Sequence, residues 1–314
     1  MAAVRKRTDR PNGASDDAEV VIRVRGLRNQ FGKQIIHDNL DLDVRRGEVI
    51  GIVGGSGSGK SVLLRTIVGL NQPAGGSIEV YGVNVTKASE AERRSLMRRW
   101  GVLFQDGALF SSLTVGQNIQ VPLKEYTDLP RALIDEVTGV KVGVVGLPPF
   151  ACAKYPSELS GGMRKRAGLA RALALDPDIV FLDEPTAGLD PIGAAAFDQL
   201  IANLQKSLNL TVFMVTHDLD SLAAICDRIA VLIDKRVIVD TMENLLKVDV
   251  PWIREYFHGP RGGRPTSSRT GIEIWRPGPA MSSSALSCSA SSSPWWFSPS
   301  GSAASASTAR STPI

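Results

Sequence analysis

The sequence has few cysteines and no long uninterrupted apolar run. Its three cysteines, Cys152, Cys226 and Cys288, show neither a pairing pattern nor metal-ligand spacing, which predicts reduced thiols in a cytosolic protein and excludes a disulfide scaffold. No apolar run approaches the roughly 20 residues that cross a bilayer. The charged N-terminus is not followed by the apolar segment of a signal peptide. We therefore expect a chain that does not enter a membrane by itself.

The sequence also lacks a strong excess of charge of one sign. Its 36 Lys and Arg residues and 32 Asp and Glu residues leave a net charge of +4 over 314 residues. This bias is too weak to indicate a nucleic-acid partner, and none is expected. One local basic cluster consists of Arg93, Arg94, Arg98 and Arg99. A solvated helix face explains this cluster most simply, although a lipid-facing or partner-facing patch would have the same composition.

Composition divides the chain into three regions. Residues 1–19 are polar, and residues 259–314 are rich in Ser, Ala, Gly and Pro without a sustained helical or strand period. Both are predicted to be disordered tails, because such segments bury too little apolar surface to offset the entropy lost on ordering. Residues 20–258 are predicted to form one domain. Within it, helical patterns dominate over about 107–174, which predicts an inserted helical subdomain.

Short apolar runs predict the central strands of this domain. Their lack of alternation indicates strands buried on both faces, and the segments between them are long enough for crossover helices, which predicts an α/β domain with a mostly parallel sheet. These runs are Val49–Val53, Ile179–Leu182, Thr211–Val215 and Ile229–Ile233. More alternating segments predict a smaller antiparallel layer; they are Val20–Leu27, Leu40–Val44 and Ser77–Tyr81.

The segment GGSGSGKS, residues 54–61, has the spacing of a phosphate-binding loop. It follows a predicted strand, precedes a helical pattern and fits G-x-x-x-x-G-K-[ST] at every fixed position. Its backbone N–H groups and the positive end of the following helix favour phosphate. The G-x-G-x-x-G dinucleotide pattern does not fit here. The expected nucleotide ligands are Gly54, Gly55, Ser56, Gly57, Ser58, Gly59, Lys60, which reaches the β- and γ-phosphates, and Ser61, which ligates Mg²⁺.

Two adjacent carboxylates end the predicted strand in IVFLDEP, residues 179–185. Burying them is costly unless a cation or a reaction uses them. Because side chains alternate along a strand, Asp183 and Glu184 point different ways. We expect Asp183 to act through Mg²⁺ and Glu184 to orient and activate the attacking water. A helix cap is the alternative for an isolated pair of this kind.

The segment LSGGM, residues 159–163, opens a proline-free helical pattern that continues to Ala174. Ser160 is placed as an N-cap, and the two glycines that follow, Gly161 and Gly162, expose backbone N–H groups at the positive helix end. Those groups form an anion site with no anion partner nearby in sequence. Locally, a simple capped helix explains the segment equally well.

Together and in this order, the three motifs resemble the ATP-binding cassette (ABC) ATPases over about residues 20–246. The resemblance implies a P-loop NTPase core of the RecA-like type with an antiparallel β layer and a helical subdomain. It also implies ATP and Mg²⁺ as ligands and a head-to-tail dimer with a second copy. Ser160, Gly161 and Gly162 would then contact the ATP bound by the partner subunit.

The same resemblance assigns four further positions. Phe31 would stack on adenine, and Gln105 would sense Mg²⁺ and the γ-phosphate. Asp190 would cross the dimer interface. His217 would contact the γ-phosphate, although a lone histidine after a strand is more often a polar cap.

Within the family, the chain is similar to the ATPases of MCE-type lipid transporters. The supporting segments are residues 103–119, 156–173 and 252–259, including Met163 where most cassettes carry Gln. This likeness implies a peripheral protein at the cytoplasmic face of the inner membrane, bound to an integral membrane permease and an MCE-type substrate-binding subunit. The transport of phospholipid between membranes, maintaining outer-membrane lipid asymmetry, is the expected function.

Two other functions share parts of this pattern. A small-solute importer would use the same cassette with a different permease. A soluble ABC protein of DNA repair or translation usually carries two cassettes or a long coiled coil, and this chain has one P-loop and no heptad run. The apolar loop residues Leu109 and Phe110 either fill the helical subdomain or contact the permease.

Overall fold

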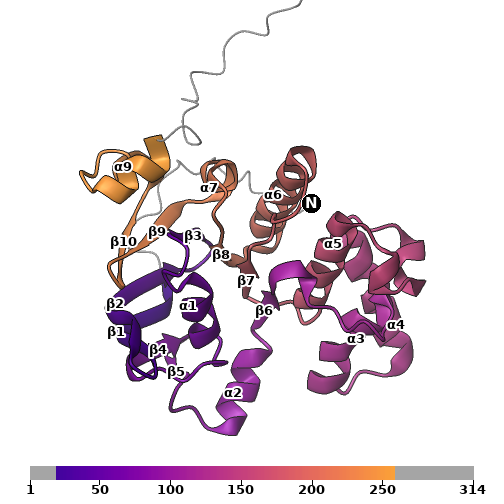
Figure 1. The fold of residues 1–314 in the computed structure, drawn as a ribbon. Coiled ribbons are helices and arrows are strands. Elements are labelled where there is room, and N and C mark those ends of the chain that lie inside the picture. The colour runs from indigo at the N-terminus through magenta and orange to yellow at the C-terminus, as the bar shows by residue number, and fades with distance from the viewer. Residues whose placement is uncertain (1–18, 259–314) are drawn as a thin grey trace, which may run out of the picture. The chain divides into compact units, whose positions relative to one another are not determined.

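The computed structural model describes residues 19–258, which form an α/β domain containing two β-sheets and a helical lobe (Figure 1). The tails predicted at 1–19 and 259–314 lie outside the described residues, except for Glu19. None of the helices in the described part is both long and apolar enough to span a bilayer.

The larger sheet has the predicted, mostly parallel arrangement. Its strand order is β10-β9-β3-β8-β7-β6, with β10 antiparallel to β9 and the other neighbouring strands parallel. Strands β3, β7 and β8 are buried along their whole length, which explains their unbroken apolar runs. The strands are β3 (Val49–Gly54), β6 (Trp100–Leu103), β7 (Ile179–Asp183), β8 (Thr211–Val215), β9 (Arg228–Ile233) and β10 (Arg236–Asp240).

The smaller sheet is antiparallel, as predicted, with the order β2-β1-β4-β5. It faces helix α1 (Lys60–Ile67), which lies between the two sheets and contributes Leu63, Leu64 and Ile67 to the core that joins them (Figure 1). The strands are β1 (Val20–Phe31), β2 (Gln34–Arg45), β4 (Gly75–Val80) and β5 (Val83–Asn84).

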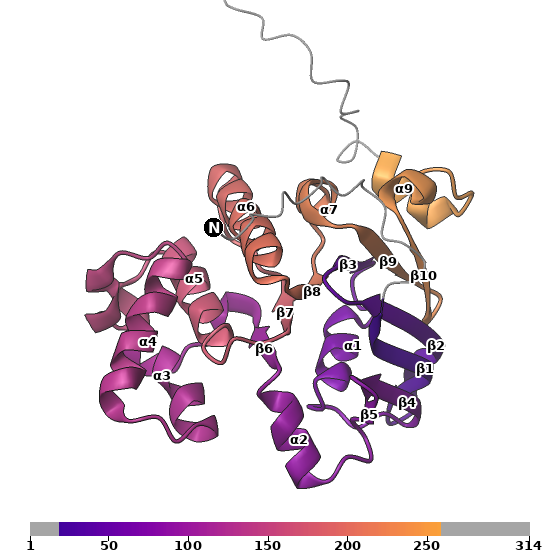
Figure 2. The same ribbon diagram turned by 180° about the vertical axis from the view of Figure 1, so that it is seen from behind.

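Helices α3, α4 and α5 form a lobe beside β6, within the segment predicted to be helical (Figures 1 and 2). The lobe shares an apolar core with one face of the central sheet and with α6. The helices are α2 (Glu90–Met97), α3 (Val115–Tyr126), α4 (Arg131–Val144), α5 (Gly161–Ala172), α6 (Pro191–Leu208), α7 (Leu219–Ile225), α8 (Met242–Leu245) and α9 (Pro251–His258), with short 3-10 turns at Gln105–Gly107, Pro149–Ala153 and Pro156–Glu158.

A glycine allows the close approach of the lobe to the sheet. A Cβ atom at Gly101 in β6 would overlap the backbone carbonyl of Ala172 at the end of α5. The end of α5 is thereby packed directly on an edge strand. The other end of α5, at Ser160, carries the LSGGM segment, so the position of that segment depends on the packing of one rigid helix.

Candidate active site

The glycine-rich segment forms a tight loop at the carboxyl end of the central strand β3. Gly57 and Gly59 have φ angles of +78° and +95°, a conformation that side chains with a Cβ rarely adopt. The N–H of Ser58 donates to the carbonyl of Gly55 at 3.1 Å, which closes the turn. The loop lies where ligands bind in open α/β sheets, outside the carboxyl ends of the strands.

Lys60 begins α1 and turns back over the loop. Its Nζ donates to the carbonyl oxygens of Gly54 at 2.9 Å and Gly55 at 3.2 Å. Burial lowers the pKa of Lys60, and the nearby carboxylates of Glu184 and Asp183 oppose that shift. A half-buried ammonium group that donates to carbonyl oxygens gains stability when an anion approaches, which suits a phosphate ligand.

Ser61 and Asp183 meet beside the loop. The Ser61 hydroxyl donates to Asp183 Oδ1 at 3.0 Å, and Asp183 is 2% exposed at the end of β7. This hydroxyl and carboxylate fit Mg²⁺, which takes oxygen ligands and is usually held by one or two carboxylates together with substrate phosphates and water. No cluster of three or more His, Cys, Asp and Glu residues suited to a metal occurs among residues 19–258, so a dedicated protein cage is not formed there.

Glu184 pairs with His217. Its Oε2 atom lies 2.7 Å from His217 Nδ1, although the two residues are 33 positions apart in sequence. Glu184 has a φ angle of +50°, and its N–H donates to the carbonyl of Val215 at the end of β8. This backbone turn separates Glu184 from Asp183. The Glu184 side chain is 16% exposed and that of His217 is 69% exposed, so the pair lies at the edge of the site, accessible to water.

Sequence analysis missed Lys165 on α5. Its Nζ donates to the backbone carbonyl of Glu184 at 2.8 Å, and the residue is 3% exposed. Burial lowers its pKa, against the opposing charges of Asp106, Glu184 and Asp183. The signal in the sequence was a lysine within the otherwise apolar face of a helix. The hydrogen bond of Lys165 connects the LSGGM helix to the turn that carries Glu184, the candidate for activating water.

The LSGGM segment begins α5 as predicted, with Ser160 as N-cap. The Ser160 hydroxyl accepts from the N–H of Met163 at 3.3 Å. The helix ends at Ala172, two residues before the predicted end, where α5 packs on β6. None of the hydrogen bonds found among residues 19–258 joins Ser160 to the phosphate-binding loop. Within one chain, the segment therefore stands apart from the nucleotide candidates.

Three other predicted residues take no part in the hydrogen bonds that join Ser61 to Asp183 and His217 to Glu184. Phe31 ends β1 and is 53% exposed, so its ring face is available for stacking. Gln105 is exposed in the turn after β6, next to the strand that ends at Asp183. Asp190 caps α6, accepting from the backbone N–H groups of Ile192 and Gly193 at 3.1 and 3.0 Å.

A buried histidine that sequence analysis also missed supports the loop from beneath. His37 is 0% exposed, and its Nδ1 accepts from Asn29 Nδ2 at 2.9 Å. Burial lowers its pKa to about 4, partly opposed by a backbone interaction with Ser58, so the ring is neutral near pH 7. Its Nε2 atom would lie 2.6 Å from a Cβ atom at Gly59. Ile36 Cγ2 would lie still closer to the same Cβ atom, so Ile36 and the His37 ring together restrict position 59 to glycine.

Gly59→Ala is therefore expected to weaken ATP binding at least about 10-fold, because the loop must move away from His37 as well as adopt a strained φ angle. Binding of a fluorescent ATP analogue measures the effect. Gly82→Ala is the matched control, since Gly82 also has a positive φ angle but has open space around it. Unchanged affinity in the Gly59 variant would contradict the role of His37 as a rigid support.

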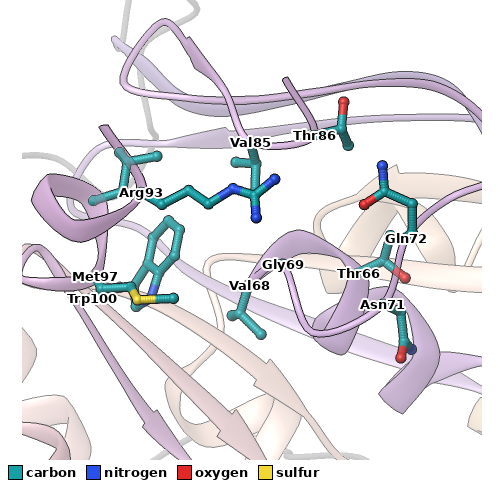
Figure 3. Close-up of a pocket in the computed structure, with 11 residues that line it drawn as sticks. Thr66, Val68, Gly69, Asn71, Gln72, Val85, Thr86, Arg93, Met97 and Trp100 are labelled. Atoms are coloured by element: carbon teal, nitrogen blue, oxygen red, sulfur yellow. The ribbon is translucent and has the colours of Figure 1, made fainter. Parts of the chain in front are cut away.

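A separate small pocket lies between the end of α1, the segment after β5, and α2 (Figure 3). The guanidinium group of Arg93 points into it beside Val85 (Figure 3). Its volume is about 50 Å³, far below the roughly 300 Å³ at which small-molecule sites begin. Two other arginines of the basic cluster form ion pairs, Arg94 with Glu125 and Arg99 with Asp178. Those two behave as a partly solvated, ion-paired surface.

Comparison with known proteins agrees with this arrangement. The ABC transporter family model matches residues 37–187. The chain is 40% identical over 244 residues to the intermembrane phospholipid transport system ATP-binding protein MlaF of Haemophilus influenzae, covering 77% of this chain and 92% of that protein. It is 40% identical over 245 residues to the probable ribonucleotide transport ATP-binding protein Mkl of Mycobacterium leprae, covering 78% and 70%.

A solved structure supports the same conclusion. It is a dimeric ATP-binding cassette in a post-hydrolysis state with bound ADP and phosphate. It is 28% identical to this chain, with a TM-score of 0.65, and the match covers 70% of this chain and 98% of that one. Family model, relatives and fold agree, and the chain belongs to the ABC transporter family of ATP-binding proteins.

Proposed function

We propose that this ABC ATPase powers phospholipid transport between membranes. In this proposal, two copies bind an integral membrane permease at the cytoplasmic face of the inner membrane, together with an MCE-type substrate-binding subunit. The observation that carries the lipid assignment is the 40% identity across 92% of the H. influenzae phospholipid transport protein. The site supports the ATPase part, because a phosphate-binding loop and two functionally distinct carboxylates meet at one edge of the sheet.

Binding of ATP would use three groups of residues. Phe31 stacks on the adenine, the loop Gly54–Ser61 surrounds the phosphates, and Lys60 exchanges its carbonyl partners for phosphate oxygens. Mg²⁺ would be held by Ser61 and Asp183, with Gln105 approaching from the turn after β6. When bound, the ion neutralises charge that develops on the phosphates.

Hydrolysis would depend on the pair Glu184 and His217. The Glu184 carboxylate accepts a hydrogen bond from the attacking water and orients it toward the γ-phosphate. His217 holds that carboxylate through Nδ1 at 2.7 Å, and its other ring nitrogen would contact the phosphate. The hydrogen bond from Lys165 to the Glu184 carbonyl fixes the turn from the opposite side.

The second copy would complete each site. The solved cassette similar to this chain is dimeric, and Ser160 stands apart from the loop of its own chain. Ser160 and the N–H groups of Gly161 and Gly162 are therefore assigned to the ATP of the partner subunit, where a helix N-terminus favours an anion. Asp190 is assigned to the dimer interface. Its cap of α6 fixes the position of its carboxylate.

The permease would dock in an apolar groove between the helical lobe and β6. Leu109 is half-buried and packs into the lobe core, whereas Phe110 is 53% exposed. Leu109 therefore fills the helical lobe, and we assign the permease contact to the exposed Phe110. The groove measures about 520 Å³ and is lined by residues that include Met97, Trp100, Phe104, Ala108, Phe110 and Tyr126.

Arg171 connects this groove to the LSGGM helix. From α5 its guanidinium group donates to the carbonyls of Ala108 at 2.8 Å and Gly107 at 3.0 Å. Ser160 begins the same helix. A movement of the permease against the loop would therefore reach the ATP of the partner subunit through one rigid element, which is how transport and hydrolysis would be coupled.

Phe110→Asp is expected to reduce transport at least about 10-fold while leaving the fold and ATP binding intact, because a charge in the apolar centre of an interface is strongly unfavourable. Copurification with the permease and lipid transport in cells measure the effect. Phe150→Asp is the matched control, since Phe150 is 63% exposed on the same lobe but does not line the groove. Normal permease binding by the Phe110 variant would remove this groove from the interface.

The equal identity to Mkl keeps a small-solute importer as the second candidate. Cells that lack this protein separate the two. If the protein serves lipid transport, these cells should show impaired outer-membrane lipid asymmetry and increased sensitivity to detergent. A normal lipid barrier combined with failure to take up a polar solute such as a ribonucleotide would replace the lipid proposal with the importer.

A further inference from the structure

Helix α9 packs against the nucleotide edge of the central sheet. Ile253 and Phe257 are 1% and 5% exposed. They share an apolar cluster with Val53, which directly precedes the phosphate-binding loop, and with Leu222 on α7. The last described helix of the chain is thereby fixed beside the two segments that carry Lys60 and His217.

Two aromatic residues on α9 face these segments. Trp252 and Tyr256, one helical turn apart, stack with ring centroids 4.7 Å apart and planes inclined by 13°. The indole nitrogen of Trp252 would lie 3.6 Å from a Cβ atom at Gly55, so the ring covers the start of the loop. Tyr256 Oη donates to the backbone carbonyl of His217 at 3.0 Å.

The hydroxyl of Tyr256 thus begins a chain of contacts that ends at the water-activating carboxylate. It holds the His217 backbone, and the His217 ring holds Glu184 at 2.7 Å. Burial, together with the charges of Glu184 and Asp218, raises the pKa of Tyr256 to about 12, so the hydroxyl keeps its proton and remains a donor near pH 7.

We propose that Tyr256 is a positioning residue for ATP hydrolysis, whose hydroxyl fixes the His217 loop so that the imidazole stays aligned with Glu184. The inference rests on the proposed roles of His217 and Glu184. It makes α9 part of the active site and not merely a cover for the sheet. The hydroxyl is separable from packing, because Ile253, Phe257 and the Tyr256 ring supply the apolar contacts without it.

Tyr256→Phe tests the hydroxyl alone in the full-length chain. Losing one hydrogen bond that aligns the catalytic pair is expected to lower kcat about 2- to 10-fold. KM for ATP and the melting temperature should stay near the wild-type values, because ground-state binding and packing are retained. Tyr81→Phe is the matched control, since Tyr81 lies in the turn between β4 and β5, away from the site. An unchanged kcat, or a raised KM with kcat unchanged, overturns the proposal.

A double-mutant cycle with His217→Ala distinguishes positioning from a general structural effect. If Tyr256 acts through His217, Tyr256→Phe should change single-turnover hydrolysis less than about 1.5-fold in the His217→Ala background. An equal loss in both backgrounds overturns the inference while leaving His217 in its role. Wild-type turnover by His217→Ala alone would instead reject the proposed role of His217, and the inference with it.

Discussion

Glu184→Gln is expected to slow ATP hydrolysis at least about 100-fold while ATP remains bound, the scale for losing one preorganised polar catalytic group. The amide keeps the shape of the side chain and can accept from His217 Nδ1, so the loop geometry should persist. It cannot take a proton from water as a carboxylate does. In the proposed site, ATP is bound by Lys60 and the glycine-rich loop, which this change leaves intact.

Steady-state phosphate release and binding of a fluorescent ATP analogue measure the two parts of this prediction. Glu243→Gln is the matched control, since Glu243 is exposed on α8. Lys60→Ala should give the opposite pattern and weaken nucleotide binding itself. Near-normal turnover by the Glu184 variant would remove Glu184 from the catalytic role and leave Asp183 as the remaining carboxylate of the site.

Ser160→Arg in both subunits is expected to lower the rate of ATP hydrolysis at least about 100-fold. This loss is expected although Ser160 shares no hydrogen bond with the loop of its own chain. A large cation at the N-terminus of α5 opposes the helix dipole and fills the place of the phosphate. Ser207→Arg, at an exposed position of α6, is the control for an added charge.

Mixing Ser160→Arg subunits with Lys60→Ala subunits should restore activity that neither variant has alone. Each mixed dimer holds one site with a normal loop from one chain and a normal LSGGM segment from the other. Random exchange makes roughly half of the dimers mixed, each with one of two sites intact, so about a quarter of wild-type turnover is expected for independent sites. Absence of recovery would indicate a site completed within one chain or strict coupling of the two sites.

Local pattern was sufficient for the fully buried central strands and for the N-cap of α5, whereas the strands β5, β6 and β10 were not predicted. The apolar runs of β3, β7 and β8 reflect burial on both faces, and such a run is a signal contained in adjacent residues of the chain. The spacing of Gly54–Ser61 determines its conformation because only glycine tolerates several of its φ angles. Local pattern could not predict which of Leu109 and Phe110 would be exposed. They are adjacent and both apolar, and only the packing of the lobe half-buries Leu109 against the lobe core and leaves Phe110 exposed.

The sequence alone determined the fold class and the family resemblance, and it supplied the candidate site residues of the glycine-rich loop, the carboxylate pair and LSGGM, because each is encoded by residue types at short, fixed spacing. Only the tertiary structure decided which of them meet. Ser61 and Asp183 are 122 positions apart, and Tyr256 and His217 are 39 apart. His37 and Lys165 belong to none of the sequence motifs described above. Their roles come from strand order and helix packing, since a hydrogen bond depends on distance in space and residue spacing along the chain does not determine that distance.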